Sequence, residues 1–377
     1  MSARPKILFF VTEDWFFVSH FLSVAKAARA AGFDVTVATR ARDPGLAARI
    51  REAGVAIVES AHRRGAFGPL AMARHVAEFR AVIRAERPDI VHCVSLRLIL
   101  LAGLAAKLAG VRRRLYAVTG LGLIGAAAGA KAAAIRRSVG MTLRGPLGGR
   151  GVRYVFENAS DAGLLGLPTA PDRSITVGGA GVDPQEVAAS PPQPPLRLAL
   201  VARMVKSKGV DVAVEAVGLA RAAGADVTLD LYGAPDSHNP RSFDEATLRL
   251  WSQREGVAWH GHSSDIAAVW RSHHVGCVPS LGGEGLPRAL LEAASHGRAI
   301  LTTATPGCRD FTRDGVEGLL VPPGDARALA DAMIRLAGDP ARVARMGEAA
   351  RARLSQGFTT AQVAEKFVAL YRAMMAA

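Results

Sequence analysis

Short apolar segments alternate with amphipathic segments along the whole chain. In the first half, seven segments of strand length are rich in Val, Ile, Leu and Phe, at residues 6–12, 33–39, 55–60, 90–95, 114–119, 153–158 and 174–179. Six more follow in the second half, at residues 196–204, 227–233, 257–262, 275–280, 298–303 and 317–323. Segments of helical length separate them, such as residues 20–31, which Gly32 closes. This alternation predicts an α/β fold with two doubly wound parallel sheets.

A proline-rich segment divides the chain. Residues 183–196 contain five prolines and no apolar periodicity, which is typical of an extended linker. A length of 377 residues also favours two domains. We therefore predict an N-terminal domain at 1–182, a linker at 183–196, a second domain at 197–357 and a C-terminal helix at 358–377. This helix carries one apolar face and is expected to pack back on the first domain; the face comprises Val363, Phe367, Leu370 and Tyr371.

The positive charge lies in the first half. The net charge is +14, and residues 1–182 hold 26 Lys and Arg against 12 Asp and Glu, whereas the remaining residues hold 21 of each. Between Asp89 and Glu157 there is no acidic residue, but there are eleven basic ones: Arg97, Lys107, Arg112, Arg113, Arg114, Lys131, Arg136, Arg137, Arg144, Arg150 and Arg153. Basic residues interleaved with apolar ones favour an anionic membrane surface, contacted through residues 97–153.

Two other interpretations of this segment are weaker. Nucleic acid is the rival partner, but the segment is almost empty of aromatic residues and no DNA-binding motif accompanies it, so we expect no nucleic acid. A genome that prefers arginine explains the abundance of arginine. It does not explain why acidic residues are missing only here.

Several protein classes are excluded. Cys93, Cys277 and Cys308 show neither a CxxC motif nor metal-ligand spacing, so we expect no disulfide framework and no metal site. The apolar run after Lys6 is too short for a signal peptide, and no stretch has the length of a spanning helix. The sequence therefore predicts a cytoplasmic globular protein.

Two cations follow the first strand of the second half. Ligands bind at the carboxyl ends of strands in an open parallel sheet, so residues just after each strand are the first candidates. Here RMVKSKG places Arg203 and Lys208 where cations and free N–H groups would hold a diphosphate. An ordinary solvated loop is the alternative for so short a pattern.

Two glutamates follow the strand at 275–280, in the segment LGGEGLPRALLEA. Glu284 precedes a turn that exposes the N–H groups of Gly285 and Leu286, and Pro287 suits the first position of a helix. Glu292 lies two turns into that helix among small and apolar residues, where a carboxylate needs a partner, and we expect a hydroxyl. Solvent-facing glutamates are again the alternative.

Together these residues resemble glycosyltransferase family 4, a group of retaining enzymes. The Glu284-x7-Glu292 spacing carries the resemblance, with Arg203 and Lys208 upstream, and it extends over segments such as DIVHCVSLRLILLAGLAAKLAG, LVARMVKSKGVD and TPGCRDFTRDGVEGLLVPPGD. Within the family the chain is most similar to bacterial enzymes that extend polyprenyl-diphosphate-linked glycans or make capsule and exopolysaccharide. The resemblance implies the GT-B fold, in which two Rossmann-like domains face each other across a cleft.

The resemblance also implies roles on the donor side. Arg203 and Lys208 would bind the diphosphate of a UDP-sugar and act in catalysis by stabilising the leaving nucleotide. Glu292 would accept the ribose hydroxyls. Glu284 would lie beside the transferred hexose or N-acetylhexosamine as a catalytic residue, with the N–H groups of Gly285 and Leu286. The donor phosphate would take the acceptor's proton, so no metal, cofactor or protein nucleophile is implied.

The acceptor side is expected in the first domain. Glu13, Asp14 and His20 follow the first strand and would face the cleft. His92 lies near a position where the family often has a catalytic histidine, and a buried structural histidine is the equal alternative.

A glycine-rich loop is the other acceptor-side candidate. The loop GLGLIG, with Gly120 and Gly122, matches a dinucleotide-binding pattern, but no acidic residue occurs about twenty positions later. The resemblance instead puts this loop on the acceptor side. His262 departs from the family, because it stands where an aromatic residue is common.

The sequence thus predicts a retaining glycosyltransferase that moves a sugar from a UDP-sugar to a lipid-linked glycan. It would work at the cytoplasmic face of the inner membrane as a peripheral protein. A nucleotide-sugar epimerase of the same fold is one alternative, although no additional acid–base cluster favours it. A non-catalytic, membrane-associated protein that binds nucleotide sugars is another, although all four donor-site residues are present.

Overall fold

The computed structural model describes residues 4–60, 68–127, 129–185 and 192–377, and the chain divides into two compact units. Unit 1 comprises Met1–Gly181 with Thr360–Ala377, and unit 2 comprises Val182–Thr359. The division falls within one residue of the predicted end of the first domain. Part of the predicted linker, residues 186–191, lies outside the described residues. Each predicted strand is present, so the α/β prediction with two parallel sheets is confirmed.

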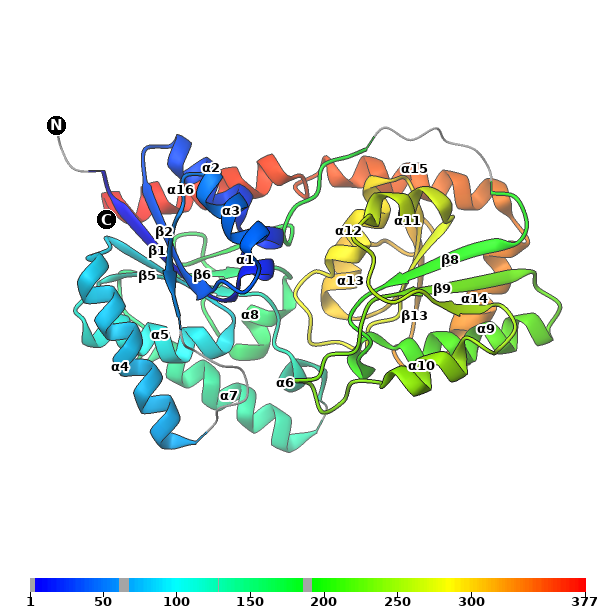
Figure 1. Cartoon of the computed structure of the whole chain (residues 1–377), viewed down its shortest axis with the longest axis horizontal. Coiled ribbons are helices and arrows are strands. Elements are labelled where there is room, and N and C mark those ends of the chain that lie inside the picture. Colours follow the sequence, from blue (N-terminus) through cyan, green and yellow to red (C-terminus); the bar gives the residue numbers. More distant parts are fainter. Residues whose placement is uncertain (1–3, 61–67, 128, 186–191) are drawn as a thin grey trace. The chain divides into compact units, whose positions relative to one another are not determined.

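Unit 1 is built on a seven-stranded sheet of order β3-β2-β1-β4-β5-β6-β7, in which every pair is parallel (Figure 1). Its strands are β1 (Lys6–Glu13), β2 (Asp34–Arg40), β3 (Ala56–Glu59), β4 (Ile90–Val94), β5 (Arg113–Val118), β6 (Val152–Phe156) and β7 (Ser174–Thr176). The order reverses between β1 and β4. Ligands of such sheets bind at a reversal of this kind, beyond the carboxyl ends of the strands.

Helices cover both faces of this sheet. One face carries α1 (Asp14–His20), α2 (Leu22–Ala30), α3 (Pro44–Glu52) and α16 (Thr360–Ala376), and the other carries α4 (Pro69–Glu86), α5 (Leu96–Leu108), α7 (Ala130–Arg144) and α8 (Ser160–Leu165). The short helix α6 (Leu123–Ala126) follows β5. Alternate residues of β4 enter the two cores, Ile90 on one side and Val91 on the other, because successive strand side chains point to opposite faces.

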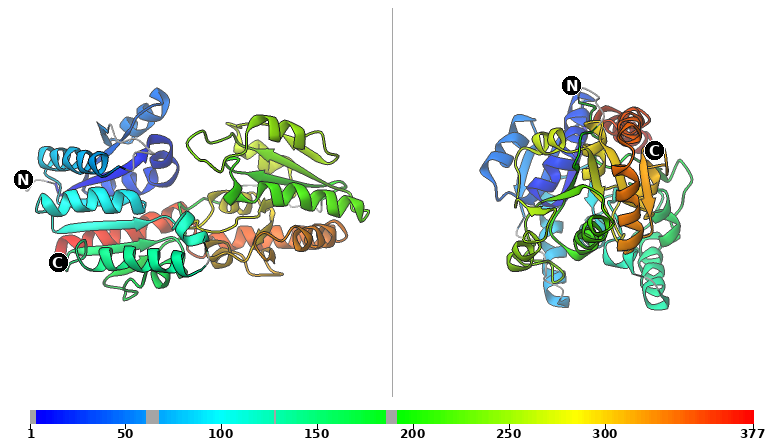
Figure 2. Two further views of the ribbon diagram at one scale, coloured as in Figure 1. Left: turned by 90° about the horizontal axis from the view of Figure 1, so that it is seen from below. Right: turned by 90° about the vertical axis from the view of Figure 1, so that its right-hand side faces the viewer.

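Helix α16 completes unit 1 from a distant part of the sequence. It buries Val363, Phe367, Leu370 and Tyr371, as predicted, and packs against α2. Figures 1 and 2 show this red helix within unit 1, although the orange helices before it belong to unit 2. The expectation that the C-terminal helix returns to the first domain is confirmed.

The helix predicted at 20–31 begins at Leu22 in the structure, two residues later than predicted. A separate helix, α1, ends at His20, and α2 starts at Leu22 after Phe21, whose backbone is not helical (φ −125°, ψ −7°). The Phe21 ring lies in the core against the rings of Phe9 and Phe367. This packing accounts for the break between the two helices.

Unit 2 is built on a six-stranded parallel sheet of order β10-β9-β8-β11-β12-β13. Its strands are β8 (Leu196–Val201), β9 (Val227–Tyr232), β10 (Val257–Trp259), β11 (Val275–Val278), β12 (Ala299–Thr303) and β13 (Gly318–Val321). Here the order reverses between β8 and β11, the two strands that precede the predicted donor-site residues.

Helices again cover both faces of the unit 2 sheet. They are α9 (Val210–Ala222), α10 (Glu245–Trp251), α11 (Ile266–Ser272), α12 (Arg288–Ser295), α13 (Pro306–Phe311), α14 (Ala326–Ala337) and α15 (Pro340–Leu354), with a 3-10 turn η1 (Lys206–Lys208) before α9. Among the helices of the described ranges, none is long and apolar enough to span a bilayer.

Candidate functional site

Two loops of unit 2 are joined at the carboxyl edge of the sheet, the one after β8 and the one after β11. Leu281 N donates to the carbonyl oxygen of Ser207 at 2.9 Å. Gly209 adopts a left-handed conformation (φ +68°), and a Cβ atom there would lie 2.0 Å from the carbonyl oxygen of Pro279. Glycine is therefore required at 209 for the two loops to approach this closely.

Lys208 and Glu284 meet where these loops join. Lys208 Nζ donates to Glu284 Oε2 at 2.5 Å, and Ser280 Oγ donates to Glu284 Oε1 at 2.8 Å. Both charged side chains keep about a fifth of their surface exposed, 21% and 22%. The structure thus brings two of the predicted donor-site residues together, as a cation and a carboxylate that a ligand can still reach.

Arg203 lies in the same loop as Lys208 but has a different partner. Its guanidinium forms an ion pair with Asp236, and its side chain is 48% exposed. Because surface ion pairs of this kind are weak, the guanidinium can exchange Asp236 for a more highly charged anion. The sequence did not predict the role of Asp236.

The turn after Glu284 is held from behind by α13. A Cβ atom on Gly307 would lie 1.6 Å from the carbonyl oxygen of Gly285, so the start of α13 packs directly on the Gly285–Leu286 turn. Helix α12 then begins at Arg288, with Pro287 at the N-cap, one residue later than predicted.

Glu292 is paired within its own helix. Its Oε1 accepts from Arg288 Nε at 2.6 Å, one turn earlier. The partner in this structure is therefore a guanidinium and not the expected hydroxyl. The side chain of Glu292 is 19% exposed, which leaves part of the carboxylate accessible.

The floor of this site is neutral. Thr303 Oγ1 donates to the carbonyl oxygen of Ser280 at 2.5 Å and holds the loop in place. Burial raises the pKa of the nearby Cys308 thiol to about 11, and the charge of Glu284 also raises it. The thiol therefore stays protonated at neutral pH and is not a nucleophile here.

Two of the predicted acceptor-side residues are structural. Asp14 is only 2% exposed, and its carboxylate accepts the backbone N–H groups of Trp15, Arg42 and Asp43 at 2.7 to 2.9 Å. Glu13 is also buried and forms an ion pair with Arg40 at 3.3 Å. The prediction that Asp14 contacts a ligand is wrong, because its oxygens hold the loop after β2. The contacts of Glu13 likewise tie β1 to the end of β2.

His20 remains a candidate and has a neighbour that the sequence did not indicate. His20 lines a small cavity with Thr119, Glu157 and Gly179, at the carboxyl ends of β5, β6 and β7. Glu157 is 8% exposed. A carboxylate directly after a buried strand is the signal that would have identified it. Gly120 and Gly122 follow β5 with φ of +119° and +57°, so glycine suits both positions.

The prediction of His92 as a catalytic residue is wrong. It lies in the middle of β4, fully buried, with its Nδ1 2.8 Å from Tyr371 Oη of α16. Its ring stacks on that of Phe367 and makes a tilted contact with that of Phe9. Burial lowers its pKa to about 3. A neutral side chain without exposure does not contact a substrate, and the structural interpretation of His92 holds.

Between Asp89 and Glu157, internal contacts account for some of the basic side chains. Within the described residues, at least five of the eleven basic side chains donate to backbone carbonyl groups: Lys107, Arg113, Arg114, Arg136 and Arg153. On α7, by contrast, Lys131, Arg137 and Arg144 are exposed beside two exposed apolar side chains, Ile135 (41%) and Met141 (50%).

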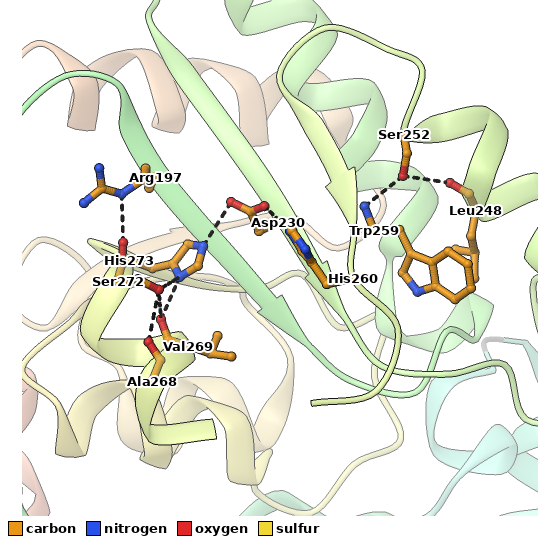
Figure 3. Close-up of polar contacts among 10 residues, drawn as sticks. All are labelled: Arg197, Asp230, Leu248, Ser252, Trp259, His260, Ala268, Val269, Ser272 and His273. Carbon is orange, nitrogen blue, oxygen red and sulfur yellow. Dashed lines mark hydrogen bonds and ion pairs between the residues drawn. The ribbon is translucent and has the colours of Figure 1, made fainter. Parts of the chain in front are cut away.

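A second polar cluster of unit 2 was not predicted from the sequence. Asp230 of β9 contacts both His260, just after β10, and His273, just after α11 (Figure 3). The alternation of apolar and polar residues in the β9 sequence, VTLDLY, was the available signal. It places Asp230 and Tyr232 on one face of the strand.

Each half of the chain matches a family of glycosyltransferases. The family described as Glycosyl transferases group 1 matches residues 195–339, and the family described as Glycosyl transferase 4-like matches residues 6–140. A phosphatidyl-myo-inositol mannosyltransferase of Mycobacterium leprae is 34% identical over 131 residues, 34% of this chain and 33% of that protein. The amylovoran biosynthesis glycosyltransferase AmsK of Erwinia amylovora is 29% identical over 171 residues, 44% of this chain and 41% of that protein.

Solved structures resemble the chain over its whole length. HepE of Anabaena, crystallised with UDP and glucose, superposes with a TM-score of 0.73 at 16% identity, covering 98% of this chain and 99% of that one. At this identity the likeness concerns the fold. The matches to the two curated relatives span only 33% and 41% of their own lengths.

Proposed function

The chain belongs to the group 1, family 4-like glycosyltransferases and has their GT-B fold, and we propose that it transfers a sugar from UDP to a lipid-linked glycan with retention of configuration. One observation carries the donor part of this proposal. Lys208 and Glu284 meet at the carboxyl edges of β8 and β11, the point of strand-order reversal where such sheets bind nucleotides.

The charges of this site suit a nucleotide diphosphate sugar. Lys208 and Arg203 each form an ion pair with a carboxylate, and a diphosphate would replace these carboxylates because it carries more negative charge. Release of Glu284 from Lys208 would free its carboxylate to accept hydroxyl groups of the transferred sugar. HepE, which shares the fold, was crystallised with UDP and glucose, and this supports UDP as the nucleotide.

The proposed chemistry needs electrostatic stabilisation more than a protein base. As the bond between the sugar and the phosphate breaks, negative charge grows on the leaving UDP, and Lys208 and Arg203 stabilise it. The proton of the acceptor hydroxyl passes to the departing phosphate oxygen. We propose no metal and no cofactor for this step.

The proposed acceptor is a glycan on a polyprenyl diphosphate, and the enzyme would work as a peripheral protein at the cytoplasmic membrane face. The exposed face of α7 supports this, because Ile135 and Met141 can enter the lipid interface while Lys131, Arg137 and Arg144 contact anionic headgroups. His20 and Glu157 are the proposed contacts for the acceptor in unit 1.

A panel of UDP-sugars with a lipid-linked acceptor tests the proposal. Lys208→Ala should lower kcat by about 100-fold or more, the loss typical of removing one group that stabilises transition-state charge. Lys206→Ala is the matched control, because Lys206 lies in the same 3-10 turn, is exposed and offers its side chain to no partner in the described structure. Equal turnover of the two variants would refute the donor assignment.

Vesicle sedimentation tests the membrane part separately. The double variant Ile135→Ser, Met141→Ser should bind anionic vesicles at least several-fold more weakly than the wild type, and rising salt should weaken both. If the wild type binds neutral and anionic vesicles equally, basic residues do not contribute to membrane binding, and that part of the proposal is refuted.

A further inference from the structure

Arginine side chains line an open cavity at the amino edge of the unit 1 sheet, where the strands begin. Helices α4 and α5 pack against each other (Figure 1), and the cavity lies between the end of α4 and the turn from α5 to β5. Its volume is about 460 Å³, which is within the range of ordinary ligand pockets. The described lining carries one carboxylate, that of Asp89, and four guanidinium groups: Arg84, Arg87, Arg112 and Arg113.

One of these arginines has a structural role. Arg113 Nε donates to the carbonyl oxygen of Met374 at 2.6 Å, and Arg113 Nη2 donates to that of Met375 at 3.3 Å. Both carbonyl groups belong to the last turn of α16. A cation that satisfies the final carbonyl groups of a helix stabilises the helix end, so Arg113 needs no ligand to explain it.

The other three arginines are not used in this way. Arg84, Arg87 and Arg112 are exposed, and their side chains form no hydrogen bond or ion pair with any described residue. Arg84 lies in the last turn of α4 and Arg87 directly after it, yet neither side chain donates to a carbonyl group there. Helix capping therefore does not account for these side chains.

The carboxylates closest to Arg87 in sequence are bound elsewhere. Glu86 Oε2 pairs with Lys6 Nζ at 2.6 Å, and Asp89 Oδ2 accepts from the backbone N–H of Lys6 at 2.8 Å. These contacts tie α4 and the start of β4 to the start of β1. Neither carboxylate forms an ion pair with an arginine of the described lining, so three guanidinium groups remain there without a counter-charge.

The backbone of Arg87 is an independent observation. It is left-handed, with φ 48° and ψ 54°, and Pro88 follows it. Residues with a Cβ atom rarely adopt this conformation, and a residue before proline favours an extended one. After α5 the chain uses Gly110 with φ +82°, which avoids the strain. An arginine thus stands where glycine would be more stable, and strain of this kind is typical of ligand-binding positions.

We propose that this arginine cavity binds a phosphate monoester or a diphosphate. Guanidinium groups recognise phosphate oxygens through pairs of parallel N–H donors. A phosphate monoester carries nearly two negative charges at neutral pH, so it would compensate most of the charge of Arg84, Arg87 and Arg112. A free phosphorylated metabolite and a lipid headgroup share this chemistry, and the experiment below separates these two sources.

The arginine cavity is separate from the proposed acceptor contacts. His20 and Glu157 line the cavity at the carboxyl ends of the strands, whereas Asp89 and Arg112 immediately precede β4 and β5. The six residues of β5, at about 3.3 Å each, put roughly 20 Å between the two edges. The inference is therefore independent of the proposed function, and either can fail without the other.

Hydrogen exchange with inorganic pyrophosphate as the probe tests the site. In the wild type, pyrophosphate should slow the exchange of peptides that contain residues 83–89 and 109–113, because a bound anion would hold the end of α4 and the turn after α5 together. These peptides belong to unit 1, so pyrophosphate at the donor site of unit 2 would not contact them. The double variant Arg84→Gln, Arg112→Gln should raise the concentration for half-maximal protection roughly tenfold or more, the equivalent of one hydrogen bond to a charged group.

The matched control is the double variant Arg49→Gln, Arg51→Gln. Both arginines are exposed and lie in the last turn of another unit 1 helix, α3. The two double variants lose the same charge, so a general attraction of pyrophosphate to a basic protein weakens equally in both. Half-maximal protection in the control should need the same concentration as in the wild type.

Arg87→Gly separates the strain from the binding. Glycine relieves the left-handed backbone, so the urea midpoint of unfolding should rise. Protection by pyrophosphate should weaken in the same variant, because a guanidinium group is lost. A stabilised variant that keeps the full protection would show that the Arg87 side chain does not contact the anion, and it would contradict the proposal.

Vesicle sedimentation identifies the source of the phosphate. Vesicles with phosphatidic acid present a monoester, and vesicles with phosphatidylglycerol present a diester. If a lipid headgroup is the ligand, Arg84→Gln, Arg112→Gln should lose a wild-type preference for phosphatidic acid. If a free metabolite is the ligand, this variant should bind both kinds of vesicle as the wild type does. The proposal is overturned if the variant changes neither pyrophosphate protection nor vesicle preference, or if the α3 control loses as much.

Discussion

The buried histidine of β4 makes unit 1 sensitive to acid. His92 stays neutral in the folded chain because burial lowers its pKa to about 3, while the unfolded chain has the ordinary value of 6.5. Below pH 6.5 the unfolded state therefore binds a proton that the folded state does not. The contribution to stability is complete above that pH and is lost progressively as the pH falls toward 3.

The size of the loss follows from the two pKa values. Linkage gives about 2 kcal/mol near pH 5 and about 4 kcal/mol near pH 3, relative to neutral pH. A loss of about 2 kcal/mol is a substantial part of the stability of an ordinary domain. Tyr371 Oη contacts Nδ1, and the other ring nitrogen, Nε2, is buried with no partner among the described residues, so a second proton on the ring would be buried without a hydrogen-bond acceptor.

Urea unfolding at about pH 7 and about pH 5 measures this loss, and hydrogen exchange of the α16 peptides localises it to unit 1. The reference is the double variant His92→Phe, Tyr371→Phe, which removes both partners of the hydrogen bond and keeps two rings in the core. Burial also lowers the pKa of His274 and of His296 in unit 2, but both proteins share these groups.

The wild type should lose about 2 kcal/mol more than the double variant between these two pH values. An equal loss in the two proteins would refute the assignment of the effect to His92. An increase in wild-type stability toward acid, relative to the variant, would refute its sign.

Three further predictions concern single sites. Gly209→Ala should weaken UDP binding at least tenfold in calorimetry, because the Cβ atom would collide with Pro279 O and the left-handed backbone disfavours alanine; unchanged affinity would contradict the role of the joined loops. Asp14→Ala should lower the free energy of urea unfolding by about 1 to 3 kcal/mol, because three N–H groups lose their acceptor. The kcat of the folded fraction should stay the same. A loss of kcat without a loss of stability would restore the predicted role of Asp14 in ligand binding. The three buried cysteines should resist thiol reagents in the native protein and react in urea, because burial raises their pKa values, to about 12 for Cys277 and about 11 for Cys308.

The strands were predictable from the sequence because each is a short apolar run between helical segments. The meeting of Lys208 with Glu284 also follows from topology, since β8 and β11 are neighbours and both residues come just after their strands. Side-chain partners were less predictable. Asp236 lies in a loop that has no periodic pattern of apolar residues, so the sequence does not show that tertiary packing brings it to Arg203.

His92 shows why a position that resembles a family motif is insufficient. The resemblance made it a catalytic candidate, but it lies in the middle of β4, and α16 covers that face of the sheet. Its partner Tyr371 is 279 positions away in sequence, so neither local pattern nor spacing could reveal the contact. Asp14 was misjudged for the same reason, because its partners lie beyond β2.

The discontinuous course of unit 1 has a consequence for protein synthesis. The ribosome makes residues 182–359, the whole of unit 2, before it reaches α16. At ordinary elongation rates, roughly 10 to 40 seconds pass between the last residue of the first segment and the end of α16. During this time the apolar surfaces of β1, β4 and α2 that later hold Phe367 and Tyr371 are uncovered, and His92 is open to protons. The nascent chain thus passes through a stage in which chaperones can bind that surface, and unit 2 can finish folding before the unit that was begun first.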